Sequence, residues 1–170
     1  MSIHLQGTRI TITEWSAADL TAALNVYNSN PAYNESIFGT PQLTCDALRS
    51  EYEKWRDMPT SHWLAIRLAD EWIGVGHIAV VNPRDEKSWI GLLMIHGEHQ
   101  RLGYGREAYH LIESHLRMLG RTSLNAGVTV SNSGALAFFG TMGFEQYRQV
   151  LAPVGKQVQP VMCMAKWLGE

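Results

Sequence analysis

The sequence feature that most constrains the fold is a change of hydrophobic period around a short glycine-rich loop. Ser88–Ile95 is almost entirely apolar, which is typical of a strand at the centre of a sheet. From Gly105, apolar residues recur every three or four positions until Gly120, which predicts an amphipathic helix ended by a glycine. Between the two lies the run Gln100-Arg101-Leu102-Gly103-Tyr104-Gly105. The chain therefore predicts a buried strand, a tight loop and a helix in direct succession.

This loop has the composition of an anion-binding site. Neither Gly103 nor Gly105 carries a Cβ, so backbone N–H groups can converge on one point. The following helix adds its unpaired N-terminal amides and the positive end of its dipole. Arg101 and Arg106 place positive charge nearby. These features suit a pyrophosphate, although the Gly-x-Gly tripeptide by itself is equally compatible with a plain strand-to-helix turn.

Two common nucleotide-binding loops do not fit. A Walker loop requires Lys and then Ser or Thr after its last glycine, whereas Arg106 and Glu107 stand there. A dinucleotide-binding fingerprint accepts Ala108 at its third position, but it also requires an acidic residue at the end of the next strand. The strand expected at Leu124–Val130 contains no acidic residue. Both alternatives are rejected.

The rest of the chain predicts a mixed fold. Besides Ser88–Ile95, the expected strands are Thr8–Thr13, Trp63–Leu68, Trp72–Val81, Leu124–Val130, Phe144–Leu151 and Gln157–Trp167. Helices are expected after Ser16, around the stripe of Leu48, Tyr52 and Trp55, after Gly105, and after the capping residue Asn132. Tyr33–Gln42 contains Gly39 and Pro41 and is expected to be an irregular loop. The order predicts an α/β (α+β mixed) fold with one βαβ unit, and so one parallel strand pair, in the middle.

Composition narrows the class of protein. With 170 residues, of which 45% are hydrophobic, we expect one domain spanning 1–170. The net charge is -2 and the cationic residues are scattered, which argues against a nucleic-acid partner. Cys45 and Cys163 lie far apart, and neither a leader nor an apolar run of about 20 residues is present, so we expect a cytoplasmic protein without a membrane partner. The spacing of the histidines matches no metal motif, so no metal is expected (His96, His99, His110 and His115).

Two segments together resemble the signatures of a known superfamily. The run Leu93–Gly105 resembles the acyl-CoA signature of the GNAT N-acetyltransferases, in which a central strand leads into Gln/Arg-x-x-Gly-x-Gly/Ala and then a helix. The run Val130–Phe144 resembles the second signature of that family, with Asn132 after the next strand, an aromatic pair, and Gly-Phe opening the following strand. The resemblance implies a mostly antiparallel sheet of about seven strands flanked by four helices, with the parallel pair at the cofactor site.

The resemblance also implies an activity and a donor site. A family member transfers an acetyl group from acetyl-CoA to a primary amine of a small molecule, an amino acid or a protein, by direct attack in a ternary complex. Backbone groups of Met94 and Ile95 would hold the pantetheine arm. Asn132 would contact the cofactor, cap a helix, or do both. The remaining cofactor-binding residues implied by the signatures are Gln100, Arg101, Leu102, Gly103, Tyr104, Gly105, Arg106 and Phe139.

The catalytic groups are not assigned by this resemblance. Many members use a Tyr as general acid where this chain has Phe139, which has no proton to donate. Tyr104 or Tyr147 could replace it, or the CoA thiolate could leave unassisted, since its pKa is near 8.5. His96 is a candidate base at the strand end, and His77 is similar. If no group serves, the chain is a non-catalytic acyl-CoA-binding sensor or interaction module.

The acceptor is not identified by the sequence either. In this family the acceptor enters between the first helices and the last strands. Tyr33 and Phe38 could wall its pocket while Glu35 attracts a cationic amine; alternatively, this stretch is a polar surface loop anchored by two aromatic rings. The identity of the amine stays open, and the family resemblance also allows a homodimer.

Overall fold

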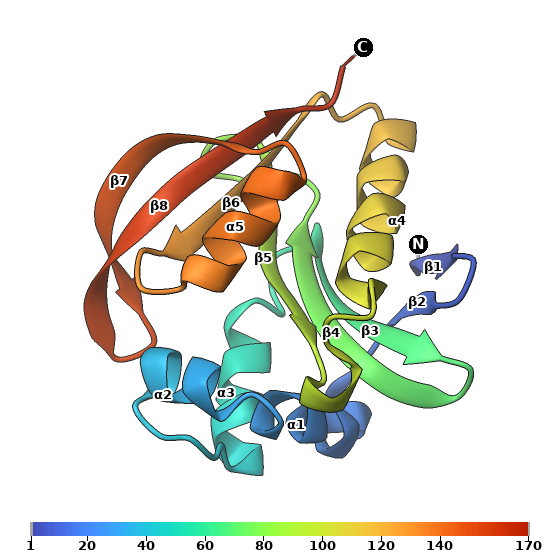
Figure 1. Cartoon of the computed structure of the whole chain (residues 1–170), viewed down its shortest axis with the longest axis vertical. Coiled ribbons are helices and arrows are strands. Elements are labelled where there is room, and N and C mark those ends of the chain that lie inside the picture. The colour runs from blue at the N-terminus through green and yellow to red at the C-terminus, as the bar shows by residue number, and fades with distance from the viewer. Residues whose placement is uncertain (1, 170) are drawn as a thin grey trace.

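The computed structural model describes residues 2–169 as one eight-stranded sheet with helices on both faces (Figure 1). The strand order is β1-β2-β3-β4-β5-β6-β8-β7. The strands are β1 (His4–Gln6), β2 (Thr11–Glu14), β3 (Ser61–Leu68), β4 (Glu71–Ala79), β5 (Ser88–Ile95), β6 (Ser123–Thr129), β7 (Glu145–Val154) and β8 (Gln157–Trp167). The α-helices are α1 (Leu20–Asn28), α2 (Pro31–Phe38), α3 (Cys45–Lys54), α4 (Tyr104–Met118) and α5 (Ser133–Thr141).

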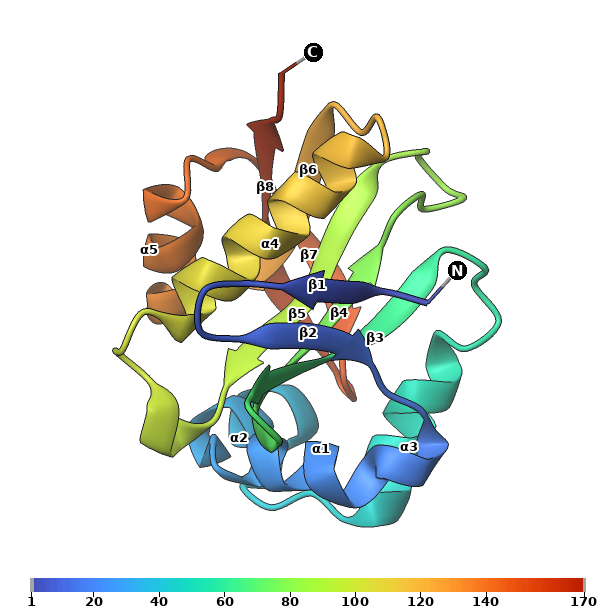
Figure 2. The ribbon, with the colours of Figure 1, turned by 90° about the vertical axis from the view of Figure 1, so that its right-hand side faces the viewer.

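The two faces of the sheet pack against different helices. Figures 1 and 2 show α1, α2 and α3 gathered together, away from α4 and α5. Side chains alternate between the faces of a strand, so Leu64 joins the core cluster that contains α4, while Trp63 joins the one that contains α1 and α3. Because both faces are covered, the central strands are apolar at nearly every position. This is the physical reason for the continuous apolar run of β5.

The only parallel pair in the described sheet, β5 with β6, separates part of the way along. Pairing runs from Ser88↔Leu124 to Ile90↔Ala126 and then stops, although both strands continue. On the other side of β5, the register with β4 shifts at Gly91. A Cβ on Gly91 would lie 2.6 Å from His77 Nδ1, so the bulge requires a residue without a side chain. Beyond Ile90, β5 has lost its partner on the β6 side.

The predicted fold class is confirmed, with a mixed and mostly antiparallel sheet and one parallel pair. The bounds expected for Ser88–Ile95 and Gln157–Trp167 are those observed. The predicted cap of α5 is also present, because Asn132 Oδ1 accepts a hydrogen bond of 3.0 Å from the Ala135 backbone N–H.

Two local predictions were wrong. Tyr33–Gln42 is not an irregular loop throughout, because Pro31–Phe38 forms α2, with the proline in its first turn and Gly39 in the left-handed conformation (φ 77°) at its C-terminal cap. Thr8–Thr13 is not one strand, because β1 and β2 form a hairpin closed by a bond of 2.8 Å from the Gly7 N–H to the Ile10 carbonyl. The described chain therefore has five α-helices and eight strands rather than four and seven.

Candidate functional site

A cavity of about 770 Å³ opens where β5 and β6 diverge. Its walls come from the end of β5, the loop before α4, the first turn of α4, α5, and the junction of α1 with α2. Nine residues expected at the donor site line it together: Met94, Ile95, Gln100, Arg101, Gly103, Gly105, Arg106, Asn132 and Phe139. Residues separated by up to 45 positions thus meet in one cavity.

The other two expected donor-site residues support the loop from outside the cavity. Leu102 is exposed, and its carbonyl accepts a hydrogen bond of 2.9 Å from Arg9 Nη1. The Tyr104 ring lies under the Arg9 guanidinium, 4.3 Å from ring centroid to Cζ. Neither residue is among those that line the cavity.

The loop is shaped by two residues in the left-handed region. Arg101 has φ 63° and Gly103 has φ 86°, and alternation of this kind turns successive amides toward one side. Within residues 2–169, none of the backbone N–H groups from Arg101 to Arg106 donates to a protein acceptor; the first such donor is the N–H of Glu107, which bonds the Gly103 carbonyl at 3.1 Å. Free amides, the start of a 15-residue helix and two arginines therefore coincide at the cavity wall.

The two glycines serve different purposes. Gly103 needs its left-handed backbone, and a Cβ there would approach Arg9 Nη2 to 3.1 Å. A Cβ on Gly105 would instead meet Ile95 Cγ1 at 3.6 Å and Phe138 Cε1 at 3.7 Å, which are ordinary contacts. Protein packing therefore does not require a glycine at position 105. The absence of a side chain there instead leaves space open in the cavity.

An ion pair from the first hairpin holds the loop and the start of α4. Arg9 Nε lies 2.8 Å from Glu107 Oε1, and the backbone N–H groups of Arg9 and Ile10 donate to Glu107 Oε2 at 2.8 and 3.1 Å. Partial burial by itself would raise the pKa of Glu107, but these hydrogen bonds and the Arg9 charge outweigh it and lower the pKa. Sequence reasoning missed Arg9 because it lies 98 positions from its partner.

A second network joins the acceptor side to the donor loop. The Ile95 carbonyl accepts hydrogen bonds from Gln100 Nε2 at 2.9 Å and from Asn30 Nδ2 at 3.2 Å. Gln100 Nε2 also donates to Asn30 Oδ1 at 2.7 Å. Asn30 lines the cavity, and the only signal for it in the sequence was the Asn-rich turn after α1.

The candidate catalytic residues lie in different places. His96 caps a short 3₁₀ turn, where its Nδ1 accepts a bond of 3.1 Å from the Glu98 N–H, and it does not line the cavity. His77 is buried between the Trp55 and Trp63 rings. Burial and the neighbouring His62 lower the pKa of His77 to about 4. Tyr147 lines a different pocket.

Only one of the three acceptor candidates lines the donor cavity. Tyr33 does so, and burial together with the Glu51 charge raises its pKa well above the usual range. Phe38 packs on Tyr27, with ring centroids 6.4 Å apart, as part of the core next to α1. Glu35 is exposed on α2. Phe139, at the position where many family members carry a Tyr, packs against Phe144 with ring centroids 5.1 Å apart.

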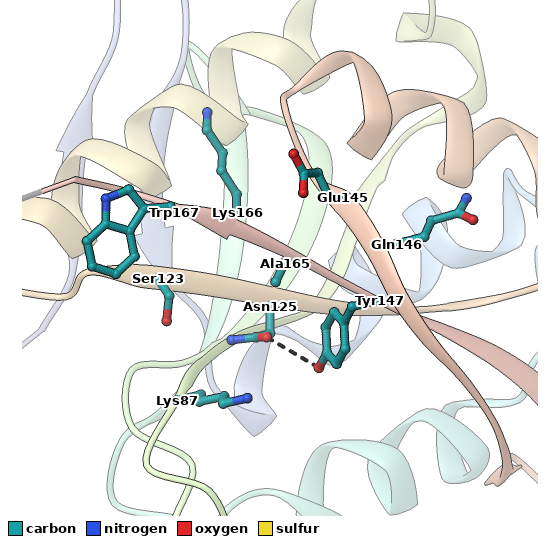
Figure 3. Close-up of a pocket in the computed structure, with 9 residues that line it drawn as sticks. All are labelled: Lys87, Ser123, Asn125, Glu145, Gln146, Tyr147, Ala165, Lys166 and Trp167. Atoms are coloured by element: carbon teal, nitrogen blue, oxygen red, sulfur yellow. Dashed lines mark hydrogen bonds between the residues drawn. The ribbon is translucent and has the colours of Figure 1, made fainter.

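Figure 3 shows a second pocket, of about 380 Å³, formed by the strands β6, β7 and β8 and the start of β5. The Tyr147 hydroxyl lies in it and contacts Asn125 Oδ1 at 3.5 Å. Burial and the Cys163 thiol raise the pKa of Tyr147, while the Arg148 guanidinium opposes the shift. The residues that line this pocket are Lys87, Ser123, Asn125, Glu145, Gln146, Tyr147, Ala165, Lys166 and Trp167.

Residues 2–169 contain neither a metal-binding cluster nor a membrane-spanning helix. No group of three or more His, Cys, Asp or Glu side chains could hold a metal ion. None of the helices in this range is long and apolar enough to cross a membrane.

Comparison with known families assigns the chain to one of them. The model of the Acetyltransferase (GNAT) family matches residues 22–144, which is most of the chain and includes both signatures. The chain therefore belongs to the GNAT family of acetyltransferases. Members use acetyl-CoA as acyl donor, so the expected enzyme class, an N-acetyltransferase, is confirmed. A search of curated proteins finds no significant match.

Solved structures share the fold at low sequence identity. An acetyltransferase from Thermus thermophilus is 22% identical with a TM-score of 0.77, over 97% of this chain and 99% of that one. A spermidine N-acetyltransferase from Vibrio cholerae, in complex with CoA and spermine, is 19% identical with a TM-score of 0.73, over 95% and 96%. The ribosomal-protein-S18-alanine N-acetyltransferase from Escherichia coli is 17% identical with a TM-score of 0.70, over 95% of each chain.

Proposed function

We propose that this protein transfers the acetyl group of acetyl-CoA directly to a primary amine within a ternary complex. The observation that carries the proposal is the row of free backbone amides from Arg101 to Arg106 at the wall of a cavity between two diverging strands. A diphosphate satisfies such amides, and the unpaired side of β5 accepts an extended arm. The chain offers both features in one cavity.

These two features support one position for the donor. The amides of the loop, with Arg101 and Arg106, hold the pyrophosphate. The arm runs beside Gly91–Ile95 toward the narrow end of the gap at Ile90 and Ala126. The Ile95 carbonyl is already bonded to Gln100 and Asn30, so these side-chain amides move, or share the carbonyl, when the arm binds. The reacting end then lies between Leu92 and Tyr33, which line the cavity on its α1–α2 side.

The chemistry requires three proton movements. The protonated acceptor amine, with a pKa of ~10.4 for a Lys-like group, loses one proton to solvent before its nitrogen bonds the carbonyl carbon of the thioester. The carbon–sulfur bond then breaks, the departing thiolate gains a proton, and the nitrogen loses its second proton as the amide forms. Tyr33 is the phenol that lines the cavity within residues 2–169, so its hydroxyl is the group of this type that can reach the departing sulfur. We assign Tyr33 the acid role that Phe139 cannot fill.

The proposal is tested by calorimetric titration with acetyl-CoA, followed by an assay of thiol release with a panel of amines. Saturable binding and thiol release with any amine support it. Binding without release on a broad panel supports a non-catalytic acyl-CoA sensor instead, the alternative that Phe139 keeps open. Absence of binding contradicts the assignment of the loop. The cytoplasmic location and a homodimeric state stay predictions; the described cysteines, Cys45 and Cys163, are both free thiols.

A further inference from the structure

The second pocket lies on the sheet face that α4 and α5 do not cover. Leu124 and Ala126 of β6 join the core cluster that contains α4, so Asn125 and Gly127, at the alternate positions, face the other way. Tyr147 and Trp167 stand on this face with 48% and 68% of their surface exposed. Two aromatic rings are thus open to solvent beside a buried amide.

Two lysines and one glutamate line this pocket. Lys87 Nζ lies 5.8 Å from the centroid of the Tyr147 ring and forms no ion pair within residues 2–169. In Figure 3, Lys166 and Glu145 project in the opposite direction to Lys87, and Lys166 is bonded to Glu113 at 2.8 Å. Asp85 is the nearby anion, and its carboxylate accepts the indole N–H of Trp89 at 3.0 Å.

A further cation lies at the edge of the pocket. Arg148 pairs in register with Cys163, which pairs with Gly127 on its other side, so these residues share a face. Arg148 is exposed and, like Lys87, has no ion-pair partner in the described part of the chain. An anion with an apolar body matches this combination of two cations and two aromatic rings.

The pocket lies within reach of the reacting end of the donor. Lys87 is three residues before Ile90, the last residue of β5 that pairs with β6. At about 3.3 Å per residue, three to five residues of strand separate the pocket from the reacting amine by roughly 10–17 Å. Gly127 lies between them on the same face and is exposed; the side chains of Val161 and Trp89 lie beside it, 3.3 and 4.0 Å from where a Cβ would stand.

We propose that the acceptor of this enzyme is an amine that carries a carboxylate about 10–17 Å from its nitrogen, and that Lys87 binds this carboxylate while Tyr147 contacts the body of the molecule. The inference rests on the proposed function, because it assigns the acceptor of that site. A small ω-amino acid and a polypeptide N-terminus with an acidic side chain about four residues along offer the same chemistry. A polyamine, which would bring a cation to Lys87, is disfavoured.

The test compares matched acceptors in the wild type, in Lys87→Gln, and in Lys156→Gln as a control. Lys156 is also exposed, and its substitution removes the same charge without touching the pocket lining. The pairs are ω-aminooctanoate with its methyl ester, and the peptide amide Ala-Ala-Ala-Glu with Ala-Ala-Ala-Gln. Wild type and Lys156→Gln should prefer the carboxylate of at least one pair by about tenfold in kcat/KM, the range of one charge-assisted hydrogen bond at a partly solvated site. Lys87→Gln should remove the preference and leave the KM for acetyl-CoA unchanged.

The pair of acceptors that shows the preference identifies the source of the carboxylate. The inference is overturned if the two acceptors of each pair react at equal rates, or if the preference survives in Lys87→Gln. In either case, turnover of any acceptor still supports the proposed function. A second measurement does not depend on turnover. Isothermal titration with ω-aminooctanoate should saturate in the wild type and weaken about tenfold in Lys87→Gln, whereas equal binding of the methyl ester overturns the inference even if no acceptor is acetylated.

Discussion

The substitution Gly105→Ala tests whether position 105 is a glycine because the fold requires it or because the ligand does. Position 105 is the second residue of α4 and does not have a left-handed backbone. The added Cβ would meet its nearest protein atoms, Ile95 Cγ1 and Phe138 Cε1, at 3.6 and 3.7 Å. Alanine lowers the entropy of the unfolded chain and favours the helix by about 0.5–1 kcal/mol relative to glycine. We therefore expect an unchanged or slightly raised melting temperature, by about 2–4 °C at most for a chain of this size.

The same substitution should weaken the donor. The methyl group occupies the cavity wall where the pyrophosphate approaches the amides of the α4 N-terminus, so we expect the Kd for acetyl-CoA to rise about tenfold or more, the range of a lost charge-assisted bond. Differential scanning calorimetry and isothermal titration measure the two effects on one sample. Gly140→Ala is the matched control, since a Cβ there meets nothing within 4 Å and the position does not line the cavity. A stable Gly105→Ala protein with normal acetyl-CoA affinity would refute the placement of the diphosphate.

Three other substitutions test the supports of the site. Gly7→Ala should destabilise the protein by about 1–3 kcal/mol, as overpacking does, because its Cβ would lie 2.6 Å from Glu107 Oε2. Urea unfolding measures this loss, and an unchanged free energy of unfolding would contradict that geometry. Glu107→Gln should be less stable than wild type above pH 4.5, the ordinary pKa of the group, with the difference vanishing as pH falls through the lowered folded pKa; a difference that stays constant as pH falls to about 2, well below the ordinary pKa of a carboxyl group, argues against the ion pair. Tyr33→Phe should lower kcat about a hundredfold with an unchanged Kd for acetyl-CoA, and an unchanged kcat removes Tyr33 as the acid.

Features set by neighbouring residues could be predicted from the sequence. The strand Ser88–Ile95, the loop to Gly105 and the cap at Asn132 each depend on residues within one turn or one strand, and each was found where it was expected. The βαβ order also determined the parallel pair. These local features position the donor loop, which is why most of the expected donor residues meet in one cavity.

Features that join distant segments could not be predicted in this way. Arg9 and Glu107 are 98 positions apart, and Asn30 and Gln100 are 70 apart, so no spacing rule connects them. The error at α2 has a different cause. Gly39 and Pro41 were taken as signs of a loop, yet Gly39 ends a helix that also buries Asn34, whose Nδ2 donates to the Tyr27 carbonyl at 2.9 Å. A left-handed glycine marks the end of a helix as readily as it marks a turn.

The network at Ile95 connects the two halves of the proposed reaction. Its carbonyl is on the unpaired part of β5, where the donor arm is expected to bind, and it is held by Gln100 of the donor loop and by Asn30 at the start of α2. Tyr33 follows on the same helix. Any adjustment of these amides on donor binding therefore acts on the helix that carries the proposed acid. With Phe139 in place of a tyrosine, the α5 side of the cavity has no phenol among the described residues. Tyr33, three residues after Asn30, offers one from α2, the helix whose first residues contact the donor site.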